Sequence, residues 1–139
     1  MSHYSEISVD IKDNQCLIET LMEIFNISKD NIEVHQSPVN LYDMVGSMRP
    51  QQAHIIVRRQ YVGIAANDMG FLKMADGTFK IIVDQYSQTT LGYNQKWLKK
   101  LKQNYTTRVA TKTLQKNGNK VTQEKLPNGM IKLSVKVRD

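Results

Sequence analysis

The chain has 139 residues, of which 40% are hydrophobic and 23% are charged, with a formal net charge of +6. This length fits a single domain, residues 1–139, that can bury its own core, and no apolar run approaches the roughly 20 residues of a membrane-spanning helix. The polar start, MSHYSEISVD, lacks the basic and apolar regions of a secretory signal. The lone cysteine, Cys16, excludes an internal disulfide, so we expect a cytoplasmic protein in a reducing compartment.

Residues 4–10 alternate apolar and polar side chains, which predicts a half-buried strand. Asp13 is a residue type suited to the N-cap of a helix. Apolar residues then recur at helical spacing and predict a helix over residues 14–26. Residues 32–34 are consistent with a short strand.

Residues 36–52 contain two prolines and a glycine and show no regular period. We therefore predict a long loop there, with the highest mobility of any internal segment. Such a loop is also a candidate place for a small-ligand or enzymatic site.

Residues 54–59 include three consecutive β-branched side chains, which favour a strand. Residues 69–74 and 79–85 predict a hairpin around Asp76-Gly77, a pair suited to a tight turn. Residues 87–93 are expected to connect this hairpin to the next helix.

Residues 94–118 form a long stretch without proline or glycine in its interior. At helical spacing, one face of this stretch is apolar, and Gly118 is suited to end the helix. We expect Trp97 to be largely buried and to anchor this helix on the sheet. Four lysines lie off the apolar face: Lys96, Lys99, Lys100 and Lys102.

Residues 121–126 and 130–138 predict a last hairpin that turns at Pro127-Asn128-Gly129. Its second strand alternates apolar and mostly cationic residues with a period of two. We expect its apolar face to pack in the core beneath the long helix, with its cations in water. The element order predicts an α+β, two-layer sandwich: an antiparallel sheet with two helices on one face.

Several stretches resemble one known family when they are taken in order: SHYSEI, DMGF, DGTFKIIVDQ, WLKKLKQNY and NGMIKLSVKVR. The family is that of the protein named for hypothetical chloroplast open reading frame thirty-five. The resemblance is weakest over residues 35–51. It implies a small protein of unknown function from cyanobacteria, algal plastids or cyanophages, located in the cytoplasm or the plastid stroma. It implies no catalytic residue.

Charge is divided unevenly along the chain. Residues 94–139 hold ten Lys and two Arg against two acidic residues, a net of +10, whereas residues 1–93 have a net of −4. This favours an anionic partner for the C-terminal third, such as an acidic protein, RNA or DNA, or a phosphate-bearing ligand. A solvated lysine face on a surface helix explains the same residues without any partner.

The sequence offers little for catalysis or for a cofactor. The histidines and Cys16 are far apart in sequence, and no phosphate-binding glycine loop or hydrolase motif occurs. We therefore predict no metal and no cofactor. Asp68, Asp76 and Asp84 lie on or beside one predicted hairpin, but their spacing alone does not make a catalytic pair.

Arg59 and Tyr61 stand two residues apart, so in a strand they share a face and offer an anion-binding pair. Together with Lys96, Lys99, Lys100 and Lys102 they are the predicted partner- or anion-binding residues. We favour a non-enzymatic accessory protein whose basic helix docks an acidic protein partner. The alternatives are an RNA- or DNA-binding protein that uses the same helix, and a small-ligand protein or enzyme with a site near residues 36–52.

Overall fold

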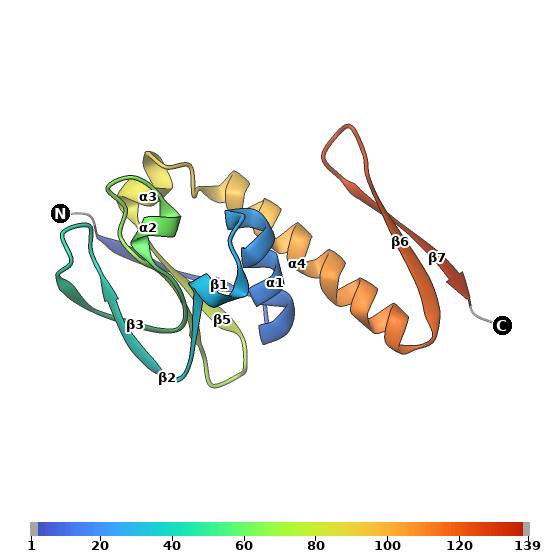
Figure 1. Cartoon of the computed structure of the whole chain (residues 1–139), viewed down its shortest axis with the longest axis horizontal. Helices are drawn as coiled ribbons and strands as arrows, with labels where there is room; N and C mark the ends of the chain where they lie inside the picture. Colours follow the sequence, from blue (N-terminus) through green and yellow to red (C-terminus); the bar gives the residue numbers. More distant parts are fainter. Residues whose placement is uncertain (1–2, 138–139) are drawn as a thin grey trace.

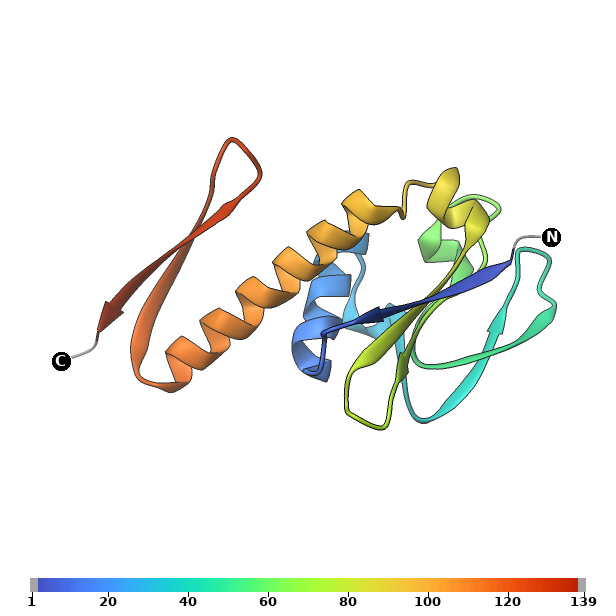
Figure 2. The same cartoon turned by 180° about the vertical axis from the view of Figure 1, so that it is seen from behind.

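The computed structural model describes residues 3–137 (Figures 1 and 2). Its helices are α1 (Asn14–Phe25), the 3-10 helix η1 (Lys29–Asn31), α2 (Arg59–Val62), α3 (Gln85–Thr89) and α4 (Gln95–Lys116). Its strands are β1 (Tyr4–Val9), β2 (Ile32–Tyr42), β3 (Met48–Val57), β4 (Met69–Lys73), β5 (Phe79–Asp84), β6 (Asn119–Lys125) and β7 (Ile131–Val137).

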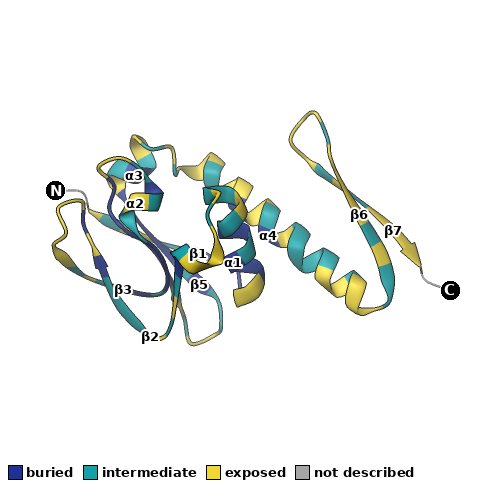
Figure 3. Ribbon diagram, viewed as in Figure 1, coloured by how far each residue is buried: buried dark blue, intermediate teal, exposed yellow. Residues whose placement is uncertain are grey.

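Five strands form one antiparallel sheet in the order β1-β5-β4-β3-β2, and β6 and β7 form a separate two-stranded sheet. Helices α1 and α4 cover one face of the larger sheet (Figure 3). Ile55, Phe71 and Ile81 stand in one row across three strands. They belong to the same buried cluster as Leu17 of α1 and Leu101 of α4. The fold is therefore mixed α+β, as the sequence predicts.

Local signals account for the two main helices. The Asp13 carboxylate caps α1 by accepting a hydrogen bond of 2.9 Å from the N–H of Cys16. The Asn94 side chain caps α4 by accepting hydrogen bonds from the N–H groups of Lys96 and Trp97. Gly118, with φ at 86°, then lets the chain turn back from α4 into β6.

Residues 36–52 form most of a hairpin, so the prediction of a long loop there is wrong. Strand β2 continues to Tyr42 and β3 begins at Met48, which leaves only a short turn between them. The β2–β3 register shifts twice, between Val34 and Val39 and again before Tyr42. These irregularities, together with Pro38, explain why the sequence shows no clean period of two.

The outer part of this hairpin supports a second, smaller core. Leu41, Ala53, Ile56 and Ile82 are buried together, apart from the main cluster. Gly70 makes the close packing feasible, because a Cβ atom at this position would lie only 2.6 Å from the Cβ of Ala53. Leu41 therefore gains its burial from residues that are distant in the sequence.

The strand predicted over residues 54–59 begins earlier and ends sooner than expected. Strand β3 ends at Val57, Arg58 is the N-cap residue of α2, and Arg59 and Tyr61 lie within α2. The prediction that Arg59 and Tyr61 share a strand face is therefore wrong. Helix α3, at the start of the predicted connection to α4, was also not expected.

The last hairpin forms as predicted but lies elsewhere. Its apolar face was expected in the main core, yet β6 and β7 pack against α4, apart from the five-stranded sheet (Figures 1 and 3). Val135 and Val137 remain 47% and 73% exposed. The apolar face of α4 is already covered by α1 and the larger sheet, so it cannot bury β7 as well. Arg138, the predicted end of the last strand, lies outside the described residues.

Candidate functional site

A groove of about 590 Å³ lies between α1, α4 and the β6–β7 hairpin. Figure 1 shows α4 running between α1 and the hairpin. The residues that line the groove, which we call the cationic groove, are Glu23, Ile24, Trp97, Lys100, Asn104, Thr107, Arg108, Gln123, Lys125 and Ile131.

Two side-chain hydrogen bonds hold the hairpin beside α4. Gln123 Nε2 of β6 donates to Thr111 Oγ1 of α4 at 3.1 Å. Gln103 Nε2 of α4 donates to the carbonyl oxygen of Gly129 in the hairpin turn at 3.3 Å. These contacts hold the hairpin along the helix at two points, in β6 and at the turn, so the cationic groove has two walls.

One carboxylate stands among the cations of the groove. Arg108 Nη2 lies 3.0 Å from Glu23 Oε2, and the Asn104 amide also donates to this oxygen. The hydrogen bond from Asn104 and then the Arg108 guanidinium lower the pKa of the Glu23 carboxyl. Glu23 is therefore ionised at neutral pH and compensates the charge of Arg108.

The other two cations lack such a partner. Among the described residues, no carboxylate lies within 4.0 Å of the ammonium nitrogen of Lys100 or Lys125. The groove therefore carries a positive charge that its own acidic residue does not cancel. This charge suits an anionic group, held by lysine ammonium groups and by the side-chain amides of Asn104 and Gln123.

An aromatic cluster forms one end of the groove. Trp97 is mostly buried, as expected, although part of it stays exposed, and its ring centroid lies 5.0 Å from that of Tyr93 and 6.1 Å from that of Phe25. Both pairs are edge-to-face contacts. Trp97 thus joins α4 to α1 and also lines the groove.

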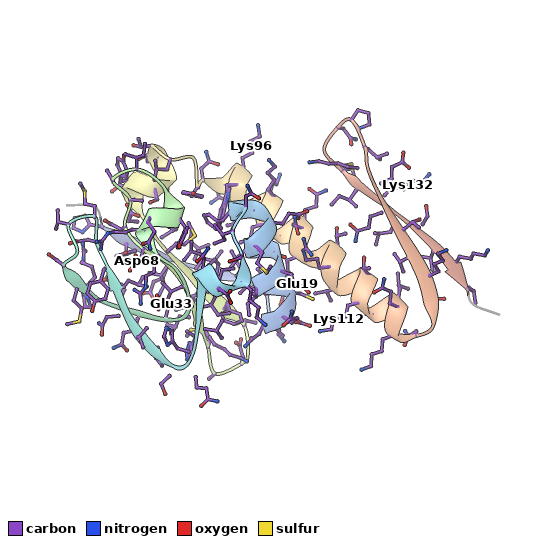
Figure 4. The ribbon with its side chains drawn as sticks, in the orientation of Figure 1. Glu19, Glu33, Asp68, Lys96, Lys112 and Lys132 are labelled. Atoms are coloured by element: carbon purple, nitrogen blue, oxygen red, sulfur yellow. The ribbon has the colours of Figure 1, made fainter. Side chains whose placement is uncertain are left out.

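The structure separates the residues that the sequence groups together. Lys96, Lys99, Lys100 and Lys102 are all exposed on α4, but only Lys100 lines the groove. Figure 4 shows Lys96 near the start of α4 and Lys132 on the hairpin, on separate elements. The groove residues from α1, β6 and β7 were missed, because the hairpin was expected on the main sheet.

Arg59 and Tyr61 lie in α2, away from the cationic groove. The guanidinium of Arg59 donates to the carbonyl oxygen of Asp43 at 3.1 Å, which ties α2 to the β2–β3 turn. This contact gives Arg59 a structural role. The strands β2 and β3 likewise occupy the segment where a loop-borne ligand or enzymatic site was considered.

Asp68 is the centre of a buried polar network. Its side chain is 1% exposed and accepts hydrogen bonds from Arg58 Nη1 and from the N–H groups of Tyr42 and Arg59. Arg58 also forms two hydrogen bonds to Glu33. The network joins β2, the end of β3 and the start of β4, so we interpret it as structural.

Asp76 and Asp84, the other two carboxylates considered in the sequence, also have local structural partners. Asp76 accepts hydrogen bonds from Thr78 in the β4–β5 turn, and Asp84 caps α3 through Ser87. Within residues 3–137, no group of three or more His, Cys, Asp or Glu side chains is arranged to hold a metal ion. In the same range, no helix has the length and apolar character needed to cross a membrane.

The sequence matches the family described as "Protein of unknown function (DUF1257)" over residues 29–134. The chain belongs to this family. The matched range includes α4, β6 and part of β7, and hence most of the cationic groove, while β1 and α1 precede it. Comparisons with curated proteins and with solved structures gave no match.

Proposed function

We propose that this protein is a non-enzymatic binding protein that holds an acidic segment of a partner protein in the cationic groove. The observation that carries the proposal is the pair Lys100 and Lys125, which face the groove from α4 and β6 without an ion-pair partner in the described part of the chain. A volume of about 590 Å³ lies within the range of about 300–1,000 Å³ that is usual for ligand sites.

The groove also has apolar walls, which favour a peptide over a free phosphate. Ile24, Trp97 and Ile131 line it beside the cations. In an acidic segment that also carries an apolar side chain, the carboxylates would contact the cations of the groove and the apolar side chain would contact its apolar walls. Electrostatic attraction would speed the encounter, and apolar burial would prolong the bound state.

Nucleic acid is the alternative that uses the same cations. Binding of single-stranded RNA relies on aromatic rings with open faces on which bases stack. Trp97 is already contacted by Phe25 and Tyr93, so it is a poor platform for stacking. We therefore favour the acidic protein segment as the ligand, and the binding experiment below also includes RNA.

Trp97 provides a direct signal for binding, because it is the single tryptophan of the chain and lines the groove. A poly-glutamate peptide with one leucine per four residues, titrated at low salt, should change the tryptophan fluorescence and saturate. Lys100→Glu with Lys125→Glu should remove this response. The matched control, Lys99→Glu with Lys102→Glu, changes the net charge equally outside the groove and should retain it.

The same titration with a single-stranded RNA oligonucleotide separates the two partner classes. We expect weak RNA binding that falls steeply with salt and is reduced similarly by both double variants. Tight RNA binding at physiological salt, lost only in the groove variant, would replace the protein-docking proposal. Equal peptide binding by both double variants would mean that the groove is not the site.

The resemblance to the family of hypothetical chloroplast open reading frame thirty-five supports a more specific setting. We propose that the partner is found in the cytoplasm of a cyanobacterium, in a plastid stroma or in a phage-infected host. Capture from such an extract by the wild-type protein and by the control variant, but not by the groove variant, would identify candidates. Nuclease treatment of the extract would show whether RNA mediates the capture.

A further inference from the structure

The β6–β7 hairpin is an incomplete sheet. A two-stranded hairpin is marginally stable in water unless another strand or a helix covers it. Here α4 contacts one face, but Val135 and Val137 remain exposed and no other described strand pairs with the outer edge of β7. An unprotected edge of this kind is a template for a further strand.

The hydrogen bonding at the turn shows which residues of β7 point their N–H and C=O groups toward β6 and which point them toward the free edge. The N–H of Leu126 donates to the carbonyl oxygen of Met130, so even-numbered residues direct their main-chain groups toward β6. Odd-numbered residues direct theirs outward. On the side-chain faces, Lys132, Ser134 and Lys136 share one face, and Leu133 and Val135 share the other.

Strand β1 is an edge of the five-stranded sheet and has the complementary pattern. The carbonyl oxygen of Ile11 accepts a hydrogen bond from the N–H of Phe79 in β5, and that of His3 accepts one from the N–H of Gln85, the residue after β5. Odd-numbered residues of β1 therefore direct their main-chain groups inward, and even-numbered residues direct theirs outward. The side-chain face of β1 that points away from the main core carries Glu6 and Ser8, and the acidic residue Asp10 follows directly after the end of the strand.

These two edges fit each other in a parallel pair. In a parallel pair of strands, a residue whose N–H and C=O groups point toward the neighbouring strand lies beside a residue of that strand whose N–H and C=O groups point away from it. Even-numbered residues of β1 therefore lie beside even-numbered residues of β7. The register that aligns Ser8 with Ser134 places Glu6 beside Lys132. Asp10, the first residue after β1, comes beside Lys136 when the pairing continues by one residue past the end of the strand.

The same register aligns the apolar faces. Ile7 lies beside Leu133, and Val9 lies beside Val135. In β1 this face is covered by α1 and α4, and in β7 it is turned toward α4. Pairing would therefore extend the larger sheet by two strands with all helices on one side.

We propose that β7 of one copy of this chain pairs in parallel with β1 of a second copy. The pairing joins two copies because α1 and α4 lie between β1 and the hairpin of a single chain in both views (Figures 1 and 2). This head-to-tail contact is heterologous, so it produces a ring or an open chain of copies. It leaves the cationic groove and its lysines, Lys100 and Lys125, outside the contact.

Charge disfavours the simpler pairings of identical edges. Two antiparallel β7 strands centred on Ser134 would place Lys132 beside Lys136 of the other copy. Two β1 strands would place Glu6 and Asp10 together in the same way. Like charges directly across a sheet are destabilising, so the opposite edges are selected. Strand β2, the other edge of the larger sheet, is protected by its register shifts and by Pro38.

Charge-swapped variants test this pairing. One variant carries Glu6→Lys with Asp10→Lys, and the other carries Lys132→Glu with Lys136→Glu. Sedimentation velocity from micromolar to millimolar concentration should show self-association of the wild type and its loss in each variant alone. An equimolar mixture of the two variants should associate again into a ring or chain in which they alternate. The basic β1 of the first variant matches the acidic β7 of the second, and the unchanged β7 of the first matches the unchanged β1 of the second.

A main-chain variant tests the edge itself. Leu133→Pro removes an N–H that points outward, so it should leave the hairpin in place and abolish self-association. Circular dichroism would verify that each variant remains folded. A wild-type protein that stays monomeric throughout, or a mixture of the two charge variants that does not associate, would overturn the proposal. Persistent self-association of each folded charge variant alone would overturn it as well.

Discussion

The hydroxyl oxygen of Tyr105 in α4 accepts a hydrogen bond of 2.9 Å from the main-chain N–H of Asp13, the N-cap residue of α1. It accepts a second hydrogen bond, of 3.0 Å, from the N–H of Lys12. Two turns later along α4, Lys112 Nζ lies 2.9 Å from the carboxylate of Asp13. Helix α4 therefore holds the start of α1 at two points and sets the angle at which α1 meets the cationic groove.

Tyr105→Phe should destabilise the protein by about 1–3 kcal/mol, because it leaves the N–H groups of Lys12 and Asp13 without their acceptor. Urea denaturation followed by circular dichroism would measure the change. Tyr42→Phe is the control, since Tyr42 is exposed and its change should stay within about 0.5 kcal/mol. Equal stability of both variants would mean that water replaces the hydroxyl oxygen of Tyr105 without cost.

Asp68→Asn should be among the most destabilising single changes. The carboxylate is 1% exposed, pairs with Arg58 and accepts two main-chain N–H groups, for which an amide is a poorer acceptor. Breaking a buried charge pair costs about 3–5 kcal/mol. Thermal melting would test this, with Asp76→Asn in the exposed β4–β5 turn as the control. A melting temperature close to that of the wild type would show that Glu33 alone can hold Arg58.

Acid should weaken the same network through Glu33. The hydrogen bonds from Arg58, and then from His35, lower the pKa of the Glu33 carboxyl below the ordinary value of 4.5. A lowered pKa in the folded state gives stability that is present above pH 4.5 and is lost as the pH falls through the folded-state pKa. Glu33→Gln should therefore reduce the stability at neutral pH and flatten its decline in acid. Parallel pH profiles of the two proteins would contradict this.

The sequence predicted the elements that are determined by neighbouring residues, and it did not predict those that depend on packing between distant residues. Helices α1 and α4 were predictable because their caps, Asp13 and Asn94, are local. The β2–β3 hairpin was not, since Leu41 is buried by Ala53 beside Gly70, across the sheet. The alternation along β7 was visible, but alternation does not reveal whether an apolar strand face packs on the core or on a helix. The cationic groove depends on that difference, so only Lys100 among its cations was predicted as a site residue.

Trp97→Ala should cost less than the loss of a fully buried aromatic residue. Full burial would predict about 3–5 kcal/mol, and because Trp97 keeps part of its surface exposed beside Phe25 and Tyr93, we expect a loss at or below the lower end of this range. Urea denaturation would give the value, and Trp97→Phe should recover most of it by restoring the edge-to-face contacts. A loss as large as full burial predicts would show that the aromatic cluster also holds α1 in place.

Glu23→Gln tests whether charge governs binding in the cationic groove. The Glu23 carboxylate compensates Arg108, so its removal should leave three uncompensated cations and raise the affinity for an acidic peptide. A single charge at the protein surface is worth about 1 kcal/mol, which corresponds to roughly a fivefold gain at low salt that fades at high salt. Glutamine can still accept a hydrogen bond from Asn104, and Glu23 is exposed, so stability should change by about 0.5 kcal/mol or less.

Glu19→Gln is the matched control, because Glu19 lies on the same helix and does not line the groove. Titration of Trp97 fluorescence would compare the two variants directly. A gain for Glu23→Gln alone would locate the bound peptide beside Arg108, whereas equal gains would reflect only the net charge of the protein. A loss of affinity in Glu23→Gln would mean that the carboxylate itself contacts the peptide. In that case the favoured partner would carry a cation next to its acidic residues.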